Sequence, residues 1–453
     1  MPFQIRWRIR NRLRSMQNLN PARIVVSSFG VIILLGTLLL MLPVASRDGQ
    51  ATHPLTCLFT ATSASCVTGL ILVDTWAHWT LFGQVVILAM IQLGGLGFMT
   101  VITLVSFALR RRIGLSERLI MVSTLNLNDM DGVVRVVRHA LMGTFLIEGT
   151  GAVVLTLCFL PRYGFLKGLW RGIFHAVSAF CNAGFDLLGT GASLTTVAGE
   201  PLLNIVLMAL VVCGGLGFLV WDDILTHRFH FSKWRLHSKI AFTGTLMALV
   251  LGTVAFFILE EDHAFAGVPT SQQILMAAFQ SVTPRTAGFN TADLTALSES
   301  GKLLTMVLML IGAGSGSTGG GIKINTFAVL VLTALARVRR REDVELFGRR
   351  LDPGDIFKAF SVSIMYFMTC MLGCMVLCLD GISMDDALFE SLSAMGTVGL
   401  TLGVTPTLTA AGKIVVTLMM FAGRGGSMSV LMAMVRDRPV PKLRRTPEKI
   451  LIG

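Results

Sequence analysis

Eight runs of apolar residues divide this sequence into hydrophobic segments separated by short polar ones. A helix needs about 20 apolar residues to cross the hydrocarbon core of a bilayer, and each run is long enough to do so. The runs lie at about 24–44, 79–109, 136–160, 201–221, 239–259, 303–336, 357–379 and 411–435. Of the 453 residues, 53% are hydrophobic and 14% are charged, which leaves too little polar surface for a soluble domain. We predict an all-α integral membrane protein with eight transmembrane helices.

The basic residues predict the orientation of these helices. An even number of spans places both termini on one side, and positive charge concentrates on the cytoplasmic side of membrane proteins. With both termini in the cytoplasm, 29 of the 38 Lys and Arg residues lie inside, in segments 1–23, 110–138, 228–239, 337–358 and 436–453. We therefore expect a multi-pass protein of the cytoplasmic membrane, in which residues 1–23 form a basic tail and not a signal peptide.

The charge and the cysteines favour no other class of partner. A net charge of +12 is typical of nucleic-acid binding only when it gathers on one polar domain, whereas here it is spread over short loops. We expect no nucleic-acid partner. The eight cysteines contain no C-x-x-C pair, so neither a disulfide framework nor a zinc site is indicated.

Four apolar stretches of about 10–12 residues are too short to cross the membrane, and each is followed by a motif of small residues. They lie within 58–75, 173–189, 277–294 and 388–404, and their alignment brings one glycine of each into register: Gly69, Gly184, Gly288 and Gly399. The pattern predicts four pseudo-repeats of outer helix, re-entrant pore helix, filter loop and inner helix around one central pore. The predicted units are tail 1–23, pore repeats 24–112, 113–227, 228–350 and 351–436, and tail 437–453.

The glycines suggest the chemistry of the re-entrant loops. Irregular backbone at membrane depth must be buried in protein or line a water-filled path. Glycine lets the chain turn its carbonyls toward an axis, and a ring of carbonyls can replace the hydration shell of K⁺. We predict K⁺ sites at the four glycines, within a filter built from Val67, Thr68, Gly69, Leu70, Asn182, Ala183, Gly184, Phe185, Thr286, Ala287, Gly288, Phe289, Thr397, Val398, Gly399 and Leu400. The alternative is that these small residues only permit close helix packing.

These loops, the glycine-rich stretch 312–321 and the arginine of "GRGGS" (423–427) resemble the ion-translocating subunits of the Trk/Ktr/HKT superfamily, most closely the KtrB type, over nearly the whole chain. The resemblance implies a fourfold pseudosymmetric pore, a homodimer, and a cytosolic ring of nucleotide-binding regulatory subunits of the KtrA/TrkA kind. In that family, glycine at all four filter positions accompanies K⁺ selectivity. The loops depart from the "TVGYG" of tetrameric channels, so we expect looser discrimination against Rb⁺ or Na⁺.

The glycine-rich stretch interrupts the apolar run 303–336. Gly314, Gly316 and Gly319 match G-x-G-x-x-G, but a dinucleotide site needs a strand before the glycines and a compact βαβ unit, whereas membrane-length apolar segments flank this match. We predict a transporter and not an enzyme, with no organic cofactor. The stretch is instead predicted to be a gate that lines the ion path, formed by Gly312, Ala313, Gly314, Ser315, Gly316, Ser317, Thr318, Gly319, Gly320 and Gly321.

Arg424 lies within the last apolar run, where a guanidinium is costly unless it faces a cavity or a partner. We predict that it projects into the pore below the filter, adds an electrostatic barrier and pairs with acceptors on the glycine-rich stretch. The alternative is an arginine that extends to the membrane interface. Lys323 either holds the stretch or caps the next helix, and Asp186 is a candidate for attracting cations to the outer mouth.

The favoured function is K⁺ uptake through a channel-like pore gated by residues 312–321 and by a cytosolic regulatory subunit. Na⁺- or H⁺-coupled secondary transport with alternating access is the alternative, and we expect only one broken span, which favours the pore. The transported ion is K⁺, with Na⁺ as a second candidate. The basic segments 227–239 and 337–350 suit membrane lipid or the regulatory ring.

Overall fold

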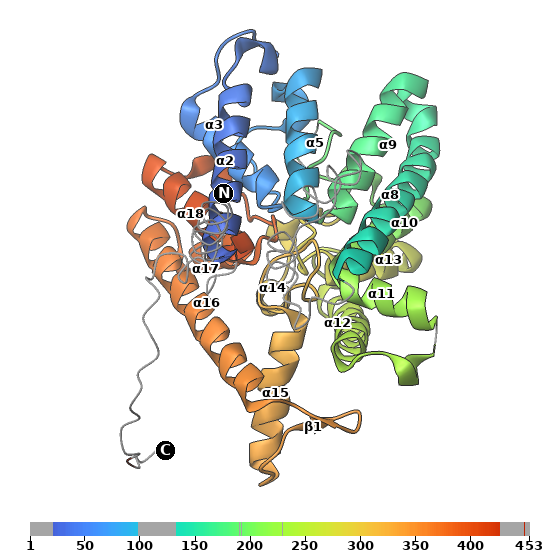
Figure 1. The fold of residues 1–453 in the computed structure, drawn as a ribbon. Coiled ribbons are helices and arrows are strands. Elements are labelled where there is room, and N and C mark those ends of the chain that lie inside the picture. Colours follow the sequence, from blue (N-terminus) through green and yellow to red (C-terminus); the bar gives the residue numbers. More distant parts are fainter. Residues whose placement is uncertain are drawn as a thin grey trace, which may run out of the picture.

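The computed structural model describes residues 21–97, 133–189, 191, 193–228, 230–425 and 448 of the chain. Within them the fold is almost entirely helical, and Figure 1 shows helices of different length and tilt gathered around a central region of irregular chain. In chain order the α-helices are α2 (Pro21–Leu40), α3 (Pro54–Ser65), α4 (Thr75–His78), α5 (Leu81–Leu96), α8 (Val133–Tyr163), α9 (Phe165–Phe180), α10 (Pro201–Leu216), α11 (Phe218–His227), α12 (Leu236–Glu260), α13 (Thr270–Val282), α14 (Glu299–Leu310), α15 (Ile324–Val338), α16 (Pro353–Leu379), α17 (Met384–Gly396) and α18 (Ala410–Gly425). Short 3₁₀ turns are η1 (Pro43–Ala45), η2 (Thr195–Val197), η3 (Phe231–Lys233), η4 (Leu294–Ala296) and η5 (Thr405–Thr407).

Long apolar helices account for part of the predicted set of eight spans. Among the described residues, α8, α12 and α16 are each long and apolar enough to cross a membrane, and α10 with α11 makes a fourth if the bent pair is one span. Shorter apolar helices cover 26–40, 81–96 and 324–338. The predicted run 79–109 is described only as far as Gly97, and the run 411–435 only as far as Gly425. Nearly all of the two predicted tails lies outside the described residues.

Local sequence determines where many helices begin. The hydroxyls of Thr80, Ser298 and Ser383 accept hydrogen bonds from backbone N–H groups in the first turns of α5, α14 and α17. Proline opens α3, α10 and α16, where its missing N–H needs no partner. These signals fix the ends of the helices that lead toward the central region.

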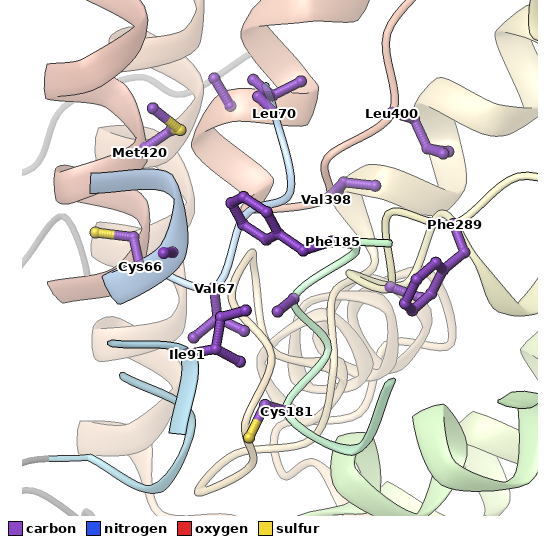
Figure 2. Packing of buried hydrophobic residues seen from close by; sticks show 14 of the residues in the cluster. Cys66, Val67, Leu70, Ile91, Cys181, Phe185, Phe289, Val398, Leu400 and Met420 are labelled. Atoms are coloured by element: carbon purple, nitrogen blue, oxygen red, sulfur yellow. The ribbon is translucent and has the colours of Figure 1, made fainter. Parts of the chain in front are cut away.

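Each of the four short apolar stretches is a helix that stops before its glycine. These half-helices are α3, α9, α13 and α17, with 12, 16, 13 and 13 residues. Each is followed by a non-helical segment, and we call residues 67–70, 182–185, 286–289 and 397–400 the glycine segments. Their apolar side chains belong to one buried cluster, in which segments far apart in the sequence lie side by side (Figure 2). The core of the fold therefore surrounds the glycine segments.

The expectation of a single broken span is wrong. Residues 201–221 do not form one helix, because α10 ends at Leu216 and α11 leaves at an angle of 93°. Gly217 at the junction has φ +100°, a left-handed conformation that glycine adopts at little cost. The predicted interruption of 303–336 is also present, since α14 ends at Leu310 and α15 begins at Ile324.

The all-α prediction missed a small hairpin on the segment 337–350. Strands β1 (Glu345–Leu346) and β2 (Arg349–Arg350) pair antiparallel, and Figure 1 shows them beside the end of α15. Phe347 and Gly348 in the turn both have positive φ, 53° and 70°, which is the geometry of a tight hairpin turn. The ring of Phe347 packs edge-on against Phe231, with 5.9 Å between centroids, and so ties the hairpin to the segment before α12.

Candidate functional site

The four glycine segments approach one another so closely that no side chain fits between them. A Cβ atom built on each glycine would lie within 3.0 Å of a backbone carbonyl oxygen on another segment. The contacts run from Gly69 to Ala183 O (2.7 Å), from Gly184 to Ala287 O (3.0 Å), from Gly288 to Val398 O (2.8 Å) and from Gly399 to Thr68 O (2.1 Å). Each segment therefore contacts the next in the order one, two, three, four and back to one.

The backbone of all four segments has the same unusual conformation. The glycines have φ between 71° and 98°, and the residue two positions earlier is also left-handed. These earlier residues are Val67 (57°), Asn182 (60°), Thr286 (75°) and Thr397 (50°). Positive φ in a β-branched residue is a genuine outlier that costs roughly 1–3 kcal/mol and tends to occur at functional sites. The four copies of this conformation indicate a shape that the surrounding protein imposes.

Hydrogen bonds to the half-helices orient the peptide planes of the segments. The N–H groups at the second position of each segment donate back to a helix carbonyl: Thr68 to Ser63 (2.8 Å), Ala183 to Ser178 (2.7 Å), Ala287 to Thr283 (2.9 Å) and Val398 to Ser393 (2.8 Å). In a trans peptide the N–H and the preceding C=O point in opposite directions. The carbonyls of Val67, Asn182, Thr286 and Thr397 therefore point away from their helices.

Serine hydroxyls near the ends of the half-helices were missed by sequence reasoning. Ser63 and Ser393 accept from the N–H groups of Gly69 and Gly399, both at 3.1 Å. In the second segment the direction is reversed, since Ser178 donates to the carbonyl of Phe185. The signal was present in the sequence, because Ser-Ala begins six residues before the glycine in the first, second and fourth segments. The third instead uses the hydroxyl of Thr283, which donates to Phe289 O.

The glycine-rich loop, residues 312–321, lies directly against the glycine segments. A Cβ on Gly319 would lie 2.1 Å from the hydroxyl oxygen of Thr286, and one on Gly320 would lie 2.1 Å from that of Thr397. The hydroxyl of Thr318 donates to the carbonyl of Phe180, the last residue of α9. The loop therefore needs glycine at these positions because no larger residue fits against the segments.

Backbone hydrogen bonds attach the loop to the break between α10 and α11. Gly314 N–H donates to Gly215 O at 2.7 Å, and Phe218 N–H donates to Gly316 O at 2.9 Å. Thr318 N–H reaches the carbonyl of Gly214 at 3.3 Å. Phe218, the first residue of α11, therefore donates its N–H to the loop and not to α10. Hydrogen bonds thus join the break at Gly217 to the break between α14 and α15.

Arg424 contacts the glycine-rich loop. Its Nη1 donates to the carbonyls of Thr318 and Gly319, and its Nη2 donates to those of Gly94 and Gly95. Backbone carbonyls thus surround the guanidinium, in place of the carboxylate that usually pairs a buried charge. The residue joins the last helix to the loop and to the end of α5.

Lys323 occupies the N-cap position of α15, but its side chain turns back to the loop. Its Nζ donates to the carbonyls of Gly319 and Gly320. Of the two predicted roles, the contacts favour holding the loop over capping the helix. Two cationic side chains, Lys323 and Arg424, therefore share the carbonyl of Gly319.

The candidate Asp186 and three buried acidic residues have local partners. Asp186 accepts from the N–H of Leu188 at 3.0 Å. Asp222 and Asp223 are buried in the middle of α11 and contact Arg235. Glu148, buried in α8, accepts from the amide of Gln92 at 3.1 and 3.2 Å. Among the described residues no group of His, Cys, Asp and Glu could hold a metal ion.

Comparison with known proteins gives one consistent family. The family model TrkH, a cation transport protein, matches residues 4–445. The chain is 39% identical over 448 residues to the "Potassium/sodium uptake protein NtpJ" of Enterococcus hirae, covering 97% of this chain and 99% of the relative. It is 38% identical over 422 residues to the "Ktr system potassium uptake protein B" of Bacillus subtilis, covering 92% and 93%.

A solved structure agrees with this result at the level of the fold. The potassium transporter TrkH from Vibrio parahaemolyticus superposes with a TM-score of 0.76 at 17% identity, covering 92% of this chain and 86% of that one. The family predicted from the glycine segments, the glycine-rich loop and Arg424 is thereby confirmed. The chain belongs to the TrkH family of cation transport proteins.

Proposed function

We propose that this chain is the ion-conducting subunit of a K⁺ uptake system of the cytoplasmic membrane. Its eight apolar runs cross the membrane as four pore repeats, each made of an outer helix, a half-helix, a glycine segment and an inner helix. The observation that carries the proposal is the closed order of contacts among the four glycine segments, whose carbonyls point away from their helices. Such carbonyls can replace the water around a dehydrated cation. The relatives are named as potassium or potassium/sodium uptake proteins, which supports K⁺ as the ion.

In this proposal the glycine-rich loop is the gate. It lies against Thr286 and Thr397 of two glycine segments, and Lys323 and Arg424 hold its carbonyls. A positive charge beside the conduction path raises the energy of a passing cation, so the same contacts both hold the loop and oppose flux. The subunit forms a homodimer and binds a cytosolic nucleotide-binding ring, which moves the loop; this part of the proposal rests on the family resemblance.

The test is K⁺ uptake by a transport-deficient cell that expresses the chain with and without a regulatory subunit. We expect the chain to restore growth at low K⁺, with faster uptake when the regulatory subunit is present. Expression at the membrane without any K⁺ uptake would contradict the proposal.

Coupled transport is the second candidate, and two observations favour it. The break at Gly217 gives a second interrupted span, as in alternating-access transporters, and one relative is named as a potassium/sodium uptake protein. Uptake that requires Na⁺, with a fixed ratio of the two ions, would establish this candidate. Uptake that follows only the K⁺ gradient would establish the channel-like pore.

Replacement of Gly69 by serine should weaken the discrimination between K⁺ and Na⁺. Gly69 has φ +98°, and a Cβ there would lie 2.7 Å from the carbonyl oxygen of Ala183, so the segment must shift. The measurement is K⁺ uptake in competition with Na⁺. Gly49→Ser is the matched control, because Gly49 also has positive φ but no atom within 4 Å of the added Cβ. Equal discrimination between K⁺ and Na⁺ in the two variants would contradict the assignment of Gly69 to the filter.

A further inference from the structure

One face of α9 presents three polar side chains to the chain that follows Gly184. Arg171, His175 and Ser178 are spaced by four and three residues, which places them on the same side of a helix. All three are buried, with exposed fractions of 3%, 0% and 0%. A polar side chain is costly to bury unless it is hydrogen-bonded, so the contacts of these three explain why they are there.

The three side chains bind backbone groups of Phe185 and Leu187. Ser178 Oγ donates to the carbonyl of Phe185 at 2.7 Å. The N–H of Leu187 donates to His175 Nε2 at 3.4 Å, and Arg171 Nε donates to the carbonyl of Leu187 at 3.1 Å. We call these three residues the α9 clamp, because together they hold the chain at the end of the glycine segment and just beyond it.

The contacts of His175 assign its protonation. Its Nδ1 lies 2.8 Å from the carbonyl of Arg171, which can only accept, and its Nε2 faces the N–H of Leu187, which can only donate. The proton therefore lies on Nδ1, and the ring is neutral. The ring also lies beside the aromatic rings of Phe159 in α8 and Phe174 in α9, with 5.2 and 6.3 Å between centroids.

His175 also contacts the third glycine segment. Its ring stacks on Phe289, the residue after Gly288, with 6.4 Å between centroids and an interplanar angle of 24°. A movement of this ring would therefore reach two neighbouring segments. The guanidinium of Arg171 instead lies over the rings of Trp76 and Tyr163, so His175 is the member of the clamp that links the two segments.

A comparable arrangement holds the fourth segment. Nine residues before Gly399, as His175 is nine residues before Gly184, α17 carries the fully buried Glu390. Its carboxylate accepts from the hydroxyls of Thr401 at 2.8 Å and Thr405 at 2.5 Å, both beyond the glycine. The same position before Gly69 is Thr60, whose buried hydroxyl has no hydrogen-bond partner among the described residues. A buried polar side chain nine residues before the glycine therefore binds the chain after the glycine in the second and fourth segments. These two segments are opposite in the order of contacts.

We propose that Arg171, His175 and Ser178 are positioning residues for cation selectivity. They fix the backbone that leaves the second glycine segment, and through Phe289 they steady the third, so that the carbonyls between them keep the spacing that favours K⁺. This inference rests on the proposed function, because it assigns a role within that conduction path. The clamp requires the neutral histidine with its proton on Nδ1.

The experiment compares His175→Leu, His175→Gln and the control Thr60→Val in K⁺ and Na⁺ uptake. Leucine removes both hydrogen bonds of the ring and leaves the buried N–H of Leu187 unpaired, so the chain beside Gly184 should shift. We expect the K⁺/Na⁺ ratio to fall about tenfold. Glutamine can accept from Leu187 N–H and donate to Arg171 O, so it should restore most of the ratio. Thr60→Val should keep the wild-type ratio, because the hydroxyl that it removes has no partner in the part of the chain that the structure describes.

The outcomes separate the clamp from the proposed function. Absence of K⁺ uptake by the wild-type protein overturns the proposed function. Wild-type uptake with an unchanged K⁺/Na⁺ ratio in His175→Leu overturns the clamp alone, as does an equal loss in the leucine and glutamine variants. If His175→Leu does not reach the membrane, Ser178→Ala takes its place, since it removes a single hydroxyl; it should lower the ratio in the same direction, and an unchanged ratio overturns the clamp.

Discussion

Replacement of Arg424 by alanine should raise K⁺ flux about tenfold in the absence of a regulatory subunit. The side chain donates to four backbone carbonyls, two on the glycine-rich loop and two at the end of α5. A hydrogen bond from a charged group contributes roughly 1.5–3 kcal/mol, and about 1.4 kcal/mol corresponds to a tenfold change in rate. Alanine removes these contacts and also the positive charge. The loss of even one contact should therefore favour a loop position that lets ions pass.

Two further variants identify how Arg424 acts. Lysine keeps the charge but lacks the planar fork that reaches both pairs of carbonyls, so Arg424→Lys should give an intermediate flux. Lys413→Ala removes a positive charge from the opposite end of the same helix and should leave the flux unchanged. The measurement is the initial rate of K⁺ uptake per molecule at the membrane. A wild-type rate for Arg424→Ala would show that the loop is held without the guanidinium.

Replacement of Gly399 by alanine should abolish most of the discrimination between K⁺ and Na⁺. A Cβ at this position would lie 2.1 Å from the carbonyl oxygen of Thr68, the shortest such approach among the four glycines. The backbone also has φ +89°, which costs an L-residue roughly 1–2 kcal/mol. The added methyl group must displace the neighbouring segment, so the spacing of the carbonyls changes. We expect the K⁺/Na⁺ ratio in competitive uptake to fall by about tenfold or more, which is a free-energy difference of about 1.4 kcal/mol.

Gly403→Ala separates this effect from backbone strain. Gly403 lies four residues further along and has φ +91°, but a Cβ there meets no atom within 4 Å. The two variants share the same conformational cost and differ in the clash. Gly403→Ala should therefore keep the wild-type ratio at a somewhat lower thermal stability. An equal loss of discrimination in both would mean that strain, and not the close approach, controls selectivity.

The sequence predicts the features of this fold that depend on local pattern. The half-helices are recognisable because their apolar stretches are too short to cross a membrane, and the glycines follow at regular intervals. The interruption of residues 303–336 is equally local, because six of the ten residues from Gly312 to Gly321 are glycine. The sequence suggests acceptors on residues 312–321 as partners of Arg424, because an arginine at membrane depth needs acceptors, but it does not establish the contact.

Features that depend on distant contacts could not be predicted. The run 201–221 is apolar apart from Asn204 and is expected to form one helix. The bend at Gly217 is stabilised by partners that are distant in sequence, since Phe218 N–H donates to the carbonyl of Gly316, 98 residues further along the chain. The left-handed backbone of Val67, Thr286 and Thr397 contradicts the preferences of β-branched residues, so no local rule predicts it. The positions of the two acceptor pairs of Arg424 likewise follow only from tertiary packing.

The hydrogen bonds that join the glycine-rich loop to the α10–α11 break make the two segments one cooperative unit. The amides of Gly314, Thr318 and Phe218 all cross this junction, and they run in both directions. If the loop moved only part of the way, these buried groups would already lose their hydrogen-bond partners. The free-energy cost would then be nearly that of complete movement. Intermediate positions are therefore poorly populated, and single-molecule currents should step between a closed and an open level with few sublevels.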